Sequence, residues 1–372
     1  MKIAIYSDTY YPTVDGVVVS ISYLRRELIK RSNKCIMVVP NQSIKGNYTR
    51  SHLFLPSVPF WGYKDYRSAV LPSMEFRYLK KFDPDILNLH GIAFTGFKGI
   101  RDSYRLKKPV ISMYHTNIMD SLHYLSKHEI MRRNIGKLIP VYLDWFLRNS
   151  DVVVFPSVTA MNEITEKIGK KTRYEIIPNA IDTTRLNIYP SKPKKMPIKG
   201  NVKLLFVGRI ALEKKLDVVL KAMKLLPENY ILNIAGNGPA LEHYTKMSRN
   251  LGIDNRVNFL GYISDEKLSE LYSNSHVFVI PSTFETQGMV ALESLYMHTP
   301  VVGANYRGLQ EIIKDDFNGY RFSQGDSSEM AEKILKAVDN IERLSNNARK
   351  SVSSYMPEVV IEKFISLFKE FV

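Results

Sequence analysis

Short runs rich in β-branched residues, most of them apolar on both faces, are separated by amphipathic stretches, and this alternation constrains the fold of the chain more than any other feature. In the first half these runs are KIAIYSD, KCIMVVP, DILNLHG, PVISMYH, DVVVFPS and YEIIPNA. Runs that are apolar on both faces are typical of strands buried in a parallel sheet. Between them lie amphipathic stretches such as SISYLRRELIKR. The alternation predicts β/α units and an α/β fold with a doubly wound sheet.

The same alternation begins a second time after residues 191–201, SKPKKMPIKGN, a segment rich in Lys and Pro that lacks periodicity. The apolar runs that follow are VKLLFVGR, YILNIAG, RVNFLGY, HVFVIPS and TPVVGAN. Since 372 residues are too many for one ordinary core, we expect two Rossmann-like domains in tandem. The segment 191–201 is interpreted as the linker between them.

Composition excludes several classes of protein. No apolar run reaches the roughly 18 residues that a membrane-spanning helix needs, and the single Cys35 excludes an internal disulfide and a cysteine-rich metal site. The N-terminus, MKIAIYSDTYYP, has the pattern of a first strand rather than of a signal peptide. We therefore expect a cytoplasmic protein.

The positive charge is unevenly distributed along the chain. Residues 1–190 contain 28 Lys and Arg against 16 Asp and Glu, a net charge of +12, whereas the remaining residues carry only +3 of the total of +15. A basic half suggests attraction to an anionic surface, either a membrane leaflet or nucleic acid. A solvated, lysine-rich face explains the charge equally well.

Each predicted domain contains a turn suited to a phosphate. In YSDTYYPTVDGVVVSIS, Gly16 ends the loop between a strand and a helix, where its backbone could approach a ligand closely. In FVGRIALEKKLD, Gly208 ends a strand and is followed by Arg209 and Lys214, whose charges suit a diphosphate. AGNGP is a third such turn. None matches the dinucleotide or P-loop motif, and a solvated basic loop is the alternative for Arg209 and Lys214 taken alone.

Two carboxylates flank a strand-to-helix turn in FETQGMVALE. Glu285 lies on the predicted loop, where it could accept hydrogen bonds from sugar hydroxyls, and Glu293 lies inside the following helix. An acidic residue in a nucleotide-binding fold commonly accepts the hydroxyls of a ribose. We therefore interpret Glu285 and Glu293 as binding two different parts of one nucleotide-sugar. The alternative is a capping acid followed by a surface helix Glu.

These motifs together resemble the retaining family-4 glycosyltransferases, which have the GT-B fold. FETQGMVALESL is similar to the E-x7-E segment of that family, and the resemblance extends over nearly the whole chain. The other similar blocks, in the family's order, are VDGVVVSI, SVPFWGYKDYRSAVLPS, FDPDILNLHGIAFTGFKG, MYHTNIMDSLHYL, FPSVTAMNEI, IIPNAIDTTRLN, LLFVGRIALEKKLD, IAGNGP, RVNFLGYISDEKLSELY and TPVVGANYRGLQEII. The sequence ETQG within this segment resembles that of family members that glycosylate lipids.

The resemblance implies a role for each matched residue. Arg209 and Lys214 would hold the donor diphosphate and stabilise the charge that develops as it leaves, and Glu293 would bind the ribose. Glu285, together with the backbone amides of Gln287, Gly288 and Met289, would bind the transferred sugar and its phosphate. Gly16 would approach the donor, and His115 would orient the sugar.

The resemblance also implies a mechanism and a domain arrangement. It implies retention at the anomeric carbon, with the leaving phosphate helping to take the acceptor proton. No metal and no cofactor are expected, because Arg209 and Lys214 would supply the positive charge that Mg²⁺ provides to a diphosphate in other enzymes. In the GT-B fold the last helix crosses back to the first domain. We therefore expect an acceptor-binding domain of residues 1–190 plus about 356–372, and a donor-binding domain of residues 191–355.

Further residues are candidates for acceptor or membrane contact. His90, after the run DILNL, could face the acceptor, with a structural histidine as the equally weighted alternative. Trp61 belongs to an aromatic segment that could dock on a membrane or form an acceptor loop. The stretch 127–151 is basic and amphipathic. It could lie on an anionic leaflet through Arg132, Arg133 and Lys137 or pack as an ordinary helix.

Three functions remain in contention. The first is transfer of a hexose, with UDP-glucose the first choice of donor and GDP-mannose the second, to a membrane lipid by a peripheral enzyme. The second is the same chemistry on a soluble sugar or sugar phosphate. The third is a non-catalytic nucleotide-sugar or nucleic-acid binder. The joint presence of the motif residues disfavours it, and no RNA-stacking motif is found.

Overall fold

The chain forms two compact units. The computed structural model describes residues 1–13, 16–41, 47–60, 67–70, 75–115 and 129–372. Unit 1 comprises Met1–Ala180 and Val360–Val372, and unit 2 comprises Ile181–Val359. The chain passes from unit 1 to unit 2 ten residues before the domain boundary expected at 190/191. It returns to unit 1 four residues after the boundary expected near 356. Residues 191–201 therefore belong to unit 2, where the backbone N–H of Lys194 donates to Ser345 Oγ at 2.7 Å.

The main sheet of unit 1 has eight strands in the order β10-β9-β8-β7-β1-β2-β4-β3, and all neighbours except β3 and β4 are parallel. A separate antiparallel pair, β5 and β6, lies outside it. The strands are β1 (Lys2–Tyr6), β2 (Lys34–Pro40), β3 (Asn47–Tyr48), β4 (His52–Leu55), β5 (Ser57–Pro59), β6 (Arg67–Ala69), β7 (Ile86–Leu89), β8 (Val110–Met113), β9 (Val152–Phe155) and β10 (Arg173–Ile176).

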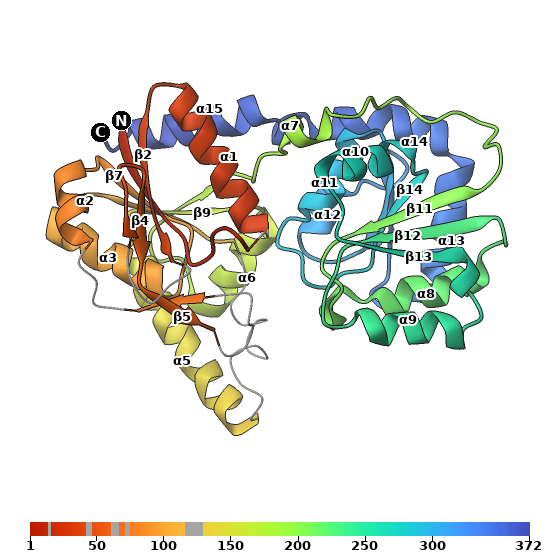
Figure 1. The fold of residues 1–372 in the computed structure, drawn as a ribbon, viewed down its shortest axis with the longest axis horizontal. Helices are drawn as coiled ribbons and strands as arrows, with labels where there is room; N and C mark the ends of the chain where they lie inside the picture. The colour runs from red at the N-terminus through yellow and green to blue at the C-terminus, as the bar shows by residue number, and fades with distance from the viewer. Residues whose placement is uncertain (14–15, 42–46, 61–66, 71–74, 116–128) are drawn as a thin grey trace. The chain divides into compact units, whose positions relative to one another are not determined.

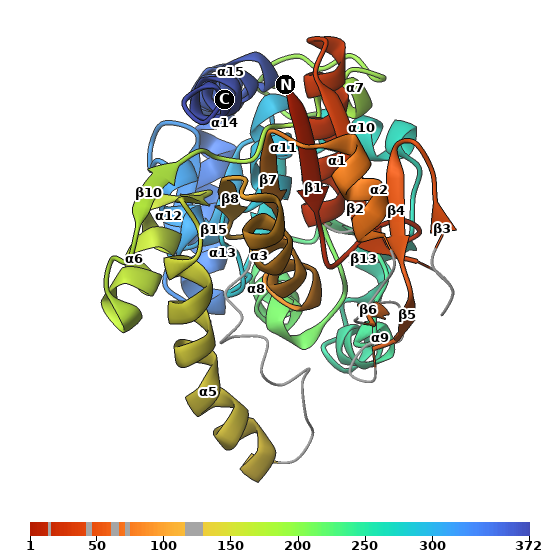
Figure 2. The ribbon, with the colours of Figure 1, turned by 90° about the vertical axis from the view of Figure 1, so that its left-hand side faces the viewer.

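Helices cover both faces of this sheet because its strands are apolar on both sides (Figures 1 and 2). The helices are α1 (Gly16–Lys30), α2 (Phe76–Phe82), α3 (Phe94–Leu106), α5 (Glu129–Arg148), α6 (Val158–Ile168) and α15 (Pro357–Lys369). Residues of α1 and α15 share one buried cluster with one set of strand side chains. Residues of α2, α3, α5 and α6 share a second cluster with the alternate set.

Helix α15 completes the core of unit 1 from the far end of the sequence. Its residues Val360, Ile361, Phe364 and Phe368 are buried against side chains of β1, β2 and α1. Arg31, the residue after α1, also pairs with Glu362 at 3.3 Å. The first 180 residues thus depend on the last helix for one face of their hydrophobic core.

Unit 2 is a six-stranded, wholly parallel sheet in the order β13-β12-β11-β14-β15-β16. The strands are β11 (Val202–Val207), β12 (Tyr230–Ala235), β13 (Val257–Gly261), β14 (Val277–Ile280), β15 (Val301–Ala304) and β16 (Gly319–Phe322). The helices are α7 (Thr183–Leu186), α8 (Leu216–Leu225), α9 (Leu241–Asn250), α10 (Asp265–Asn274), α11 (Met289–Tyr296), α12 (Gly308–Ile312), α13 (Ser327–Asp339) and α14 (Ile341–Ala348). Three short 3₁₀ helices join them: η2 (Leu212–Lys214), η3 (Asp254–Arg256) and η4 (Arg349–Tyr355).

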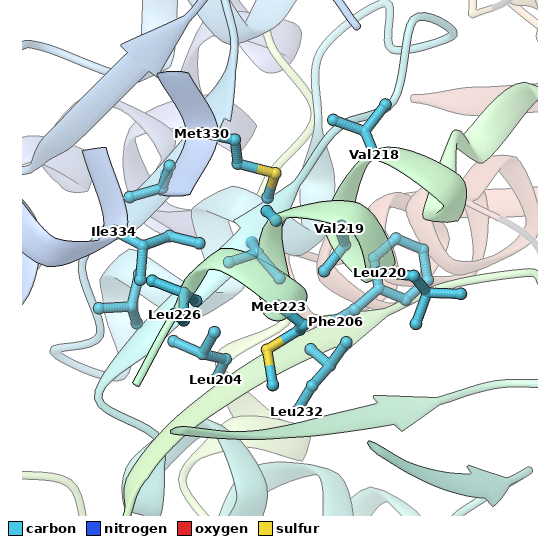
Figure 3. Close-up of a cluster of buried hydrophobic side chains, with 14 of the residues drawn as sticks. Leu204, Phe206, Val218, Val219, Leu220, Met223, Leu226, Leu232, Met330 and Ile334 are labelled. Carbon is cyan, nitrogen blue, oxygen red and sulfur yellow. The ribbon is translucent and has the colours of Figure 1, made fainter. Parts of the chain in front are cut away.

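Alternate residues of β11 divide the core of unit 2 between the two faces of the sheet. Leu204 and Phe206 pack with Met223 of α8 and Ile334 of α13 (Figure 3). Leu205, between them, belongs to the cluster formed with α10, α11, α12 and η4. This period of two is the signature of a strand with helices on both sides.

All eleven strands expected from the sequence are confirmed, and each of them pairs with its neighbours in the parallel direction. The sequence analysis did not identify β4, β16 or the short β3, β5 and β6. The predicted α/β class with two Rossmann-like units is therefore correct. None of the helices among the described residues is long and apolar enough to cross a bilayer.

The dependence of unit 1 on α15 is testable by truncating a buried side chain. Phe368→Ala removes a fully buried ring and is expected to lower the free energy of unfolding of unit 1 by about 3–5 kcal/mol. Both tryptophans of the chain, Trp61 and Trp145, fall within unit 1, so tryptophan fluorescence during urea unfolding reports on that unit. Val372→Ala, at an exposed position nearby, is the control. Equal urea midpoints for the two variants would contradict this role of α15.

Candidate functional site

The strand order of unit 2 reverses once, between β11 and β14. From β11 the chain adds β12 and β13 towards one edge of the sheet. It then returns to the other side of β11 and adds β14, β15 and β16 towards the opposite edge. The loops that leave the carboxyl ends of β11 and β14 therefore diverge, and ligands of doubly wound sheets bind at such a point. The sequence places Arg209 and Lys214 after β11, and Glu285 and Gln287 after β14.

Backbone contacts between glycines hold the loops after β11 and β12 together. Gly208, with φ +149°, donates its N–H to Ala235 O at 3.0 Å, and Ile210 N–H donates to Asn237 O at 2.9 Å. A Cβ on Gly236 would overlap the carbonyl oxygen of Gly208, and one on Gly238 would overlap that of Ile210. The turn AGNGP is thus a support for the loop that carries Arg209.

Both cations of the predicted diphosphate site are paired with carboxylates. Arg209 Nη2 donates to Glu213 Oε1 at 2.8 Å, and Lys214 Nζ donates to Glu285 Oε1 at 2.6 Å. The second pair joins the loop after β11 to the loop after β14, and both of its side chains are largely buried. The structure therefore brings Lys214 and Glu285 together. The basic loop is not simply a solvated one.

The loop after β14 turns sharply into α11 at Gly288. This residue has φ +86°, and a Cβ there would come within 2.7 Å of Leu309 Cδ2, so both conformation and space favour glycine. Gln287, just before it, is buried, and Met289 begins the helix. The first N–H groups of a helix lack acceptors inside the helix, which makes this start suited to phosphate or hydroxyl oxygens.

Glu293 is a buried member of a charged cluster. Only 5% of the residue is exposed. Its Oε2 accepts a hydrogen bond from Tyr272 Oη at 2.9 Å, and its Oε1 lies 3.9 Å from Arg185 Nη1. Burial raises the pKa of Glu293 above its ordinary value, whereas the charge of Arg185 and the Tyr272 hydroxyl act to lower it. A surface helix Glu is therefore the wrong interpretation of this residue.

Sequence reasoning missed four residues that the structure adds to this region: Arg185, Glu213, Tyr272 and Arg307. Arg185 and Tyr272 contact Glu293 from α7 and α10. Both residues lie in blocks that resemble the family, IIPNAIDTTRLN and RVNFLGYISDEKLSELY, but neither was assigned a role from the sequence. Arg307, after β15, has φ +46°, a strained value for a residue other than glycine. It precedes Gly308, whose N–H donates to Glu285 O at 3.3 Å. The position of Arg307 thus borders the loop that carries Glu285.

Among the parallel strands of unit 1 the order also reverses once, between β1 and β7. Asp8 follows β1, and its carboxylate accepts hydrogen bonds from the N–H groups of Ala93 and Thr95, each at 2.8 Å, and so caps the start of α3. His90 follows β7 and His115 follows β8. The rings of these histidines stack at a centroid distance of 5.0 Å, and His90 Nδ1 lies 2.7 Å from His115 Nε2.

Both histidines are buried. Burial and the neighbouring His115 lower the pKa of His90 well below its ordinary value, and burial lowers the pKa of His115 from 6.5 to about 4. The pair is therefore uncharged at neutral pH. His90 Nε2 also lies 2.6 Å from Asn88 Oδ1, so His90 contacts its neighbours with both ring nitrogens. Of the two alternatives for His90, this arrangement favours the structural histidine over the acceptor contact.

The remaining predicted residues are less constrained. Gly16 begins α1, and a Cβ there would meet no atom within 4 Å. Trp61 and the side chain of Arg132 lie outside the described residues, whereas Arg133 and Lys137 are exposed on α5. Within the described ranges, no three His, Cys, Asp or Glu side chains are grouped so that they could hold a metal ion.

The low pKa of His115 predicts that unit 1 is destabilised by acid. Because the folded pKa is about 4 and the ordinary value is 6.5, the unfolded chain binds more protons between these two values. The free energy of unfolding should therefore fall as pH decreases from 6.5 towards 4, by on the order of 2–3 kcal/mol from His115. Urea midpoints across this range, read by tryptophan fluorescence, should vary less in His115→Gln. The exposed His243→Gln in unit 2 should keep the wild-type dependence, and an unchanged dependence in His115→Gln would contradict the prediction.

The sequence also matches known protein families and individual proteins. Residues 14–185 match the family model Glycosyltransferase Family 4, and residues 190–351 match the model Glycosyl transferases group 1. The chain is 29% identical over 385 residues to the alpha-monoglucosyldiacylglycerol synthase of Streptococcus pneumoniae, covering all of this chain and 85% of that protein. A protein of the same name from Acholeplasma laidlawii is 23% identical over 392 residues, covering 100% of this chain and 98% of that protein.

A solved structure shows the same architecture. Anabaena HepE in complex with UDP superposes with a TM-score of 0.78 at 15% sequence identity, and its complex with UDP-glucose gives 0.76 at 15%, with all of both chains covered in each case. The two-unit fold is that of the GT-B glycosyltransferases. The family models together match most of the sequence, and the chain therefore belongs to the family-4 and group-1 glycosyltransferases with the GT-B fold.

Proposed function

We propose that this chain is a retaining hexosyltransferase that takes its sugar from a nucleoside diphosphate donor, UDP-glucose in the first instance, and transfers it to a membrane lipid. The observation that carries the donor assignment is the Lys214–Glu285 pair at the strand-order reversal of unit 2. It holds a cation and a carboxylate at the start of a helix, where a diphosphate and a sugar each find a partner. HepE, of the same fold, is solved with UDP-glucose.

In this proposal Arg209 and Lys214 bind the donor diphosphate. Their pairing with Glu213 and Glu285 fixes the long side chains in place, so less side-chain freedom is lost when the donor binds. The diphosphate then takes up the remaining donor hydrogens of the two cations. Glu285 keeps its second oxygen for a sugar hydroxyl, and the backbone amides of Gln287, Gly288 and Met289 serve the sugar and its phosphate.

Glu293 is assigned to the ribose hydroxyls. Tyr272 occupies its Oε2, and Arg185 faces Oε1 from 3.9 Å, beyond hydrogen-bond distance. Each carboxylate oxygen has two lone pairs, so Glu293 keeps capacity for hydroxyl donors. A ribose would also replace part of the solvation that this buried carboxylate lacks. Unit 1 supplies Gly16 and His115 in the roles that the family resemblance implies.

The chemistry follows from charge. The bond between the anomeric carbon and the phosphate oxygen breaks, and negative charge grows on the departing nucleoside diphosphate, where Arg209 and Lys214 stabilise it. The acceptor hydroxyl bonds to the same face of the anomeric carbon, and its proton passes to the leaving phosphate oxygen. No protein base is required, which suits a site whose carboxylates Glu213 and Glu285 are both engaged with cations.

A lipid acceptor is supported by the relatives and by the surface of unit 1. Two relatives that align with this whole chain are called alpha-monoglucosyldiacylglycerol synthases. Helix α5 extends well beyond the sheet of its unit (Figure 2). It exposes Leu138 and Val141, 67% and 68% accessible, beside Arg133 and Lys137. Apolar side chains flanked by cations suit the surface of an anionic leaflet, and we propose that α5 makes this contact.

The donor assignment is tested by thermal stabilisation and steady-state kinetics. A nucleotide-sugar that binds only the folded protein adds about 2.7 kcal/mol at a hundred times its Kd, so a panel of UDP- and GDP-sugars identifies the donor. Glu293→Ala is expected to raise the donor KM, and Lys214→Ala to lower kcat, each by about tenfold or more, roughly 1.4 kcal/mol. Controls are Glu332→Ala and Lys221→Ala, on exposed positions of unit 2. If neither test variant changed either parameter tenfold, the assignment would be wrong.

The membrane contact is tested by flotation with vesicles. The wild-type protein should float with vesicles containing anionic lipid and much less with neutral ones, and added salt should release it because the attraction is partly electrostatic. Leu138→Ser/Val141→Ser should reduce the bound fraction several-fold. Leu225→Ser, at an exposed position on α8 of unit 2, should bind as wild type. If Leu138→Ser/Val141→Ser bound the vesicles to the same extent as the wild-type protein, α5 would not be the membrane contact.

A further inference from the structure

The carboxylate of Glu293 on α11 meets side chains from two other elements of unit 2, α7 and α10. Tyr272 of α10 donates its hydroxyl to Oε2 at 2.9 Å, and Nη1 of Arg185 on α7 lies 3.9 Å from Oε1. Within the described part of the chain no residue donates a hydrogen bond to Oε1, and 7% of the Glu293 side chain is exposed. The protein therefore holds one oxygen of this carboxylate, and the other can accept hydrogen bonds from a ligand.

The position of Arg185 is determined by the way α7 packs against α10. The next residue, Leu186, is fully buried, and its carbonyl oxygen accepts a hydrogen bond from Ser269 Oγ of α10. The guanidinium of Arg185 also pairs with the carboxylate of Asp265 on α10, with Nε 3.3 Å from Oδ1. Arg185 is thus held beside Glu293 at a distance at which it does not occupy Oε1.

A carboxylate as buried as that of Glu293 needs a neighbouring cation to stay ionised. Burial raises the pKa of Glu293, the charge of Arg185 is the strongest influence that lowers it, and the hydrogen bond from Tyr272 follows. Asp182 and Asp265 act in the same direction as burial. An ionised carboxylate only accepts hydrogen bonds, whereas a protonated one also carries a donor. The charge of Glu293 therefore decides how well it binds hydroxyl groups.

Charged side chains on the other elements packed against α11 have different partners. They are Arg349 of η4, which donates to Tyr296 Oη, Glu311 of α12, which lies near Tyr355, and Glu342 and Arg343 of α14, which contact the N–H of Met196 and the carboxylate of Asp316. Lys350 of η4 is exposed. Strands β14 and β15, which also pack against α11, consist of apolar residues and glycine. Arg185 is therefore the cation that most directly sets the charge of Glu293.

We propose that Arg185 and Tyr272 are positioning residues for the nucleotide-sugar donor. Tyr272 holds one oxygen of Glu293, and Arg185 keeps the carboxylate charged without competing for the other oxygen, so that Oε1 accepts hydroxyls of the ribose. This role rests on the proposed transferase function. Because both residues act through Glu293 rather than on the reacting atoms, their loss should weaken donor binding and leave the turnover of bound donor nearly unchanged.

The charge of Glu293 is measured without any substrate by ¹³C NMR of the glutamate carboxyl groups during a pH titration. Glu293→Gln identifies the signal. In Arg185→Gln the titration midpoint of Glu293 should rise by about one pH unit or more, because a neutral amide replaces the cation. Arg185→Lys keeps the charge and should restore most of the wild-type value. Equal midpoints in the wild-type protein and Arg185→Gln would overturn the proposal.

Two further variants complete this measurement. Arg249→Gln is the matched control, because Arg249 is exposed on α9, and it should leave the Glu293 signal unchanged. Tyr272→Phe removes the hydroxyl and keeps the buried ring, so it tests the proposal even if Arg185→Gln does not fold. The Glu293 midpoint should rise in Tyr272→Phe as well. An unchanged midpoint there would show that Tyr272 is not a positioning residue.

Binding of UDP separates a positioning role from direct contact with the nucleotide. At about pH 6.5 Arg185→Gln should bind UDP roughly tenfold more weakly than the wild-type protein. The ratio of the two Kd values should approach one as the pH rises, because Glu293 then ionises in the variant as well. The titration of UDP itself cancels in this ratio. A loss of affinity that is equal at every pH would mean that Arg185 contacts the nucleotide directly, and the proposal would be wrong.

The same variants distinguish failure of this proposal from failure of the proposed function. At about pH 6.5 Arg185→Gln should raise the donor KM about tenfold, while kcat stays within about twofold. If no nucleotide binds the wild-type protein but the Glu293 midpoint rises in Arg185→Gln, the proposed function fails and the control of Glu293 by Arg185 stands. If Arg185→Gln binds UDP as tightly as the wild-type protein despite a raised midpoint, the contact between Oε1 and the ribose is overturned.

Discussion

The rest of this structure depends on one constraint, the single reversal of order among the parallel strands of each main sheet. Because parallel strands need crossover helices, every loop at their carboxyl ends emerges on the same edge, and the reversal is the point where two such loops diverge. In unit 2 this point separates β11 from β14 and gives Lys214 a partner in Glu285. In unit 1 this point separates β1 from β7, and His90 is the first residue after β7.

Electrostatic neutrality is maintained locally around the candidate donor site. Arg209, Lys214 and Arg185 each face a carboxylate, and the partners of the last two are largely buried. Charges placed in a half-buried loop would otherwise be costly to desolvate. The strong positive charge of the first 190 residues therefore has a different origin from the cations that we assign to the donor. It belongs to surfaces such as the exposed face of α5.

The sequence predicted what depends on local pattern. Eleven strands were found because most of them are apolar on both faces and stand in a regular alternation with amphipathic stretches, although β10 and β13 are only partly apolar. The short β4 and β16 were not identified. The positions of Lys214, Glu285 and Gly288 followed from motifs that stand beside strands. The pairing of Glu293 with Arg185 did not, because the two residues are 108 positions apart and meet only through packing of α7 against α10 and α11. For His90 the sequence left an acceptor contact and a structural role open, because its contacts with Asn88 and His115 are made only when β7 and β8 lie side by side.

The order in which the two units acquire their cores differs from their order in the sequence. Unit 2 lies between the two segments of unit 1, so all of its strands leave the ribosome before residues 360–368 do. The first 180 residues meanwhile lack the side chains of α15 that cover one face of their sheet. Domains usually fold in the order of their synthesis. Here the N-terminal unit must wait with an uncovered apolar face, and a chaperone that binds such a face has its longest opportunity during the synthesis of unit 2.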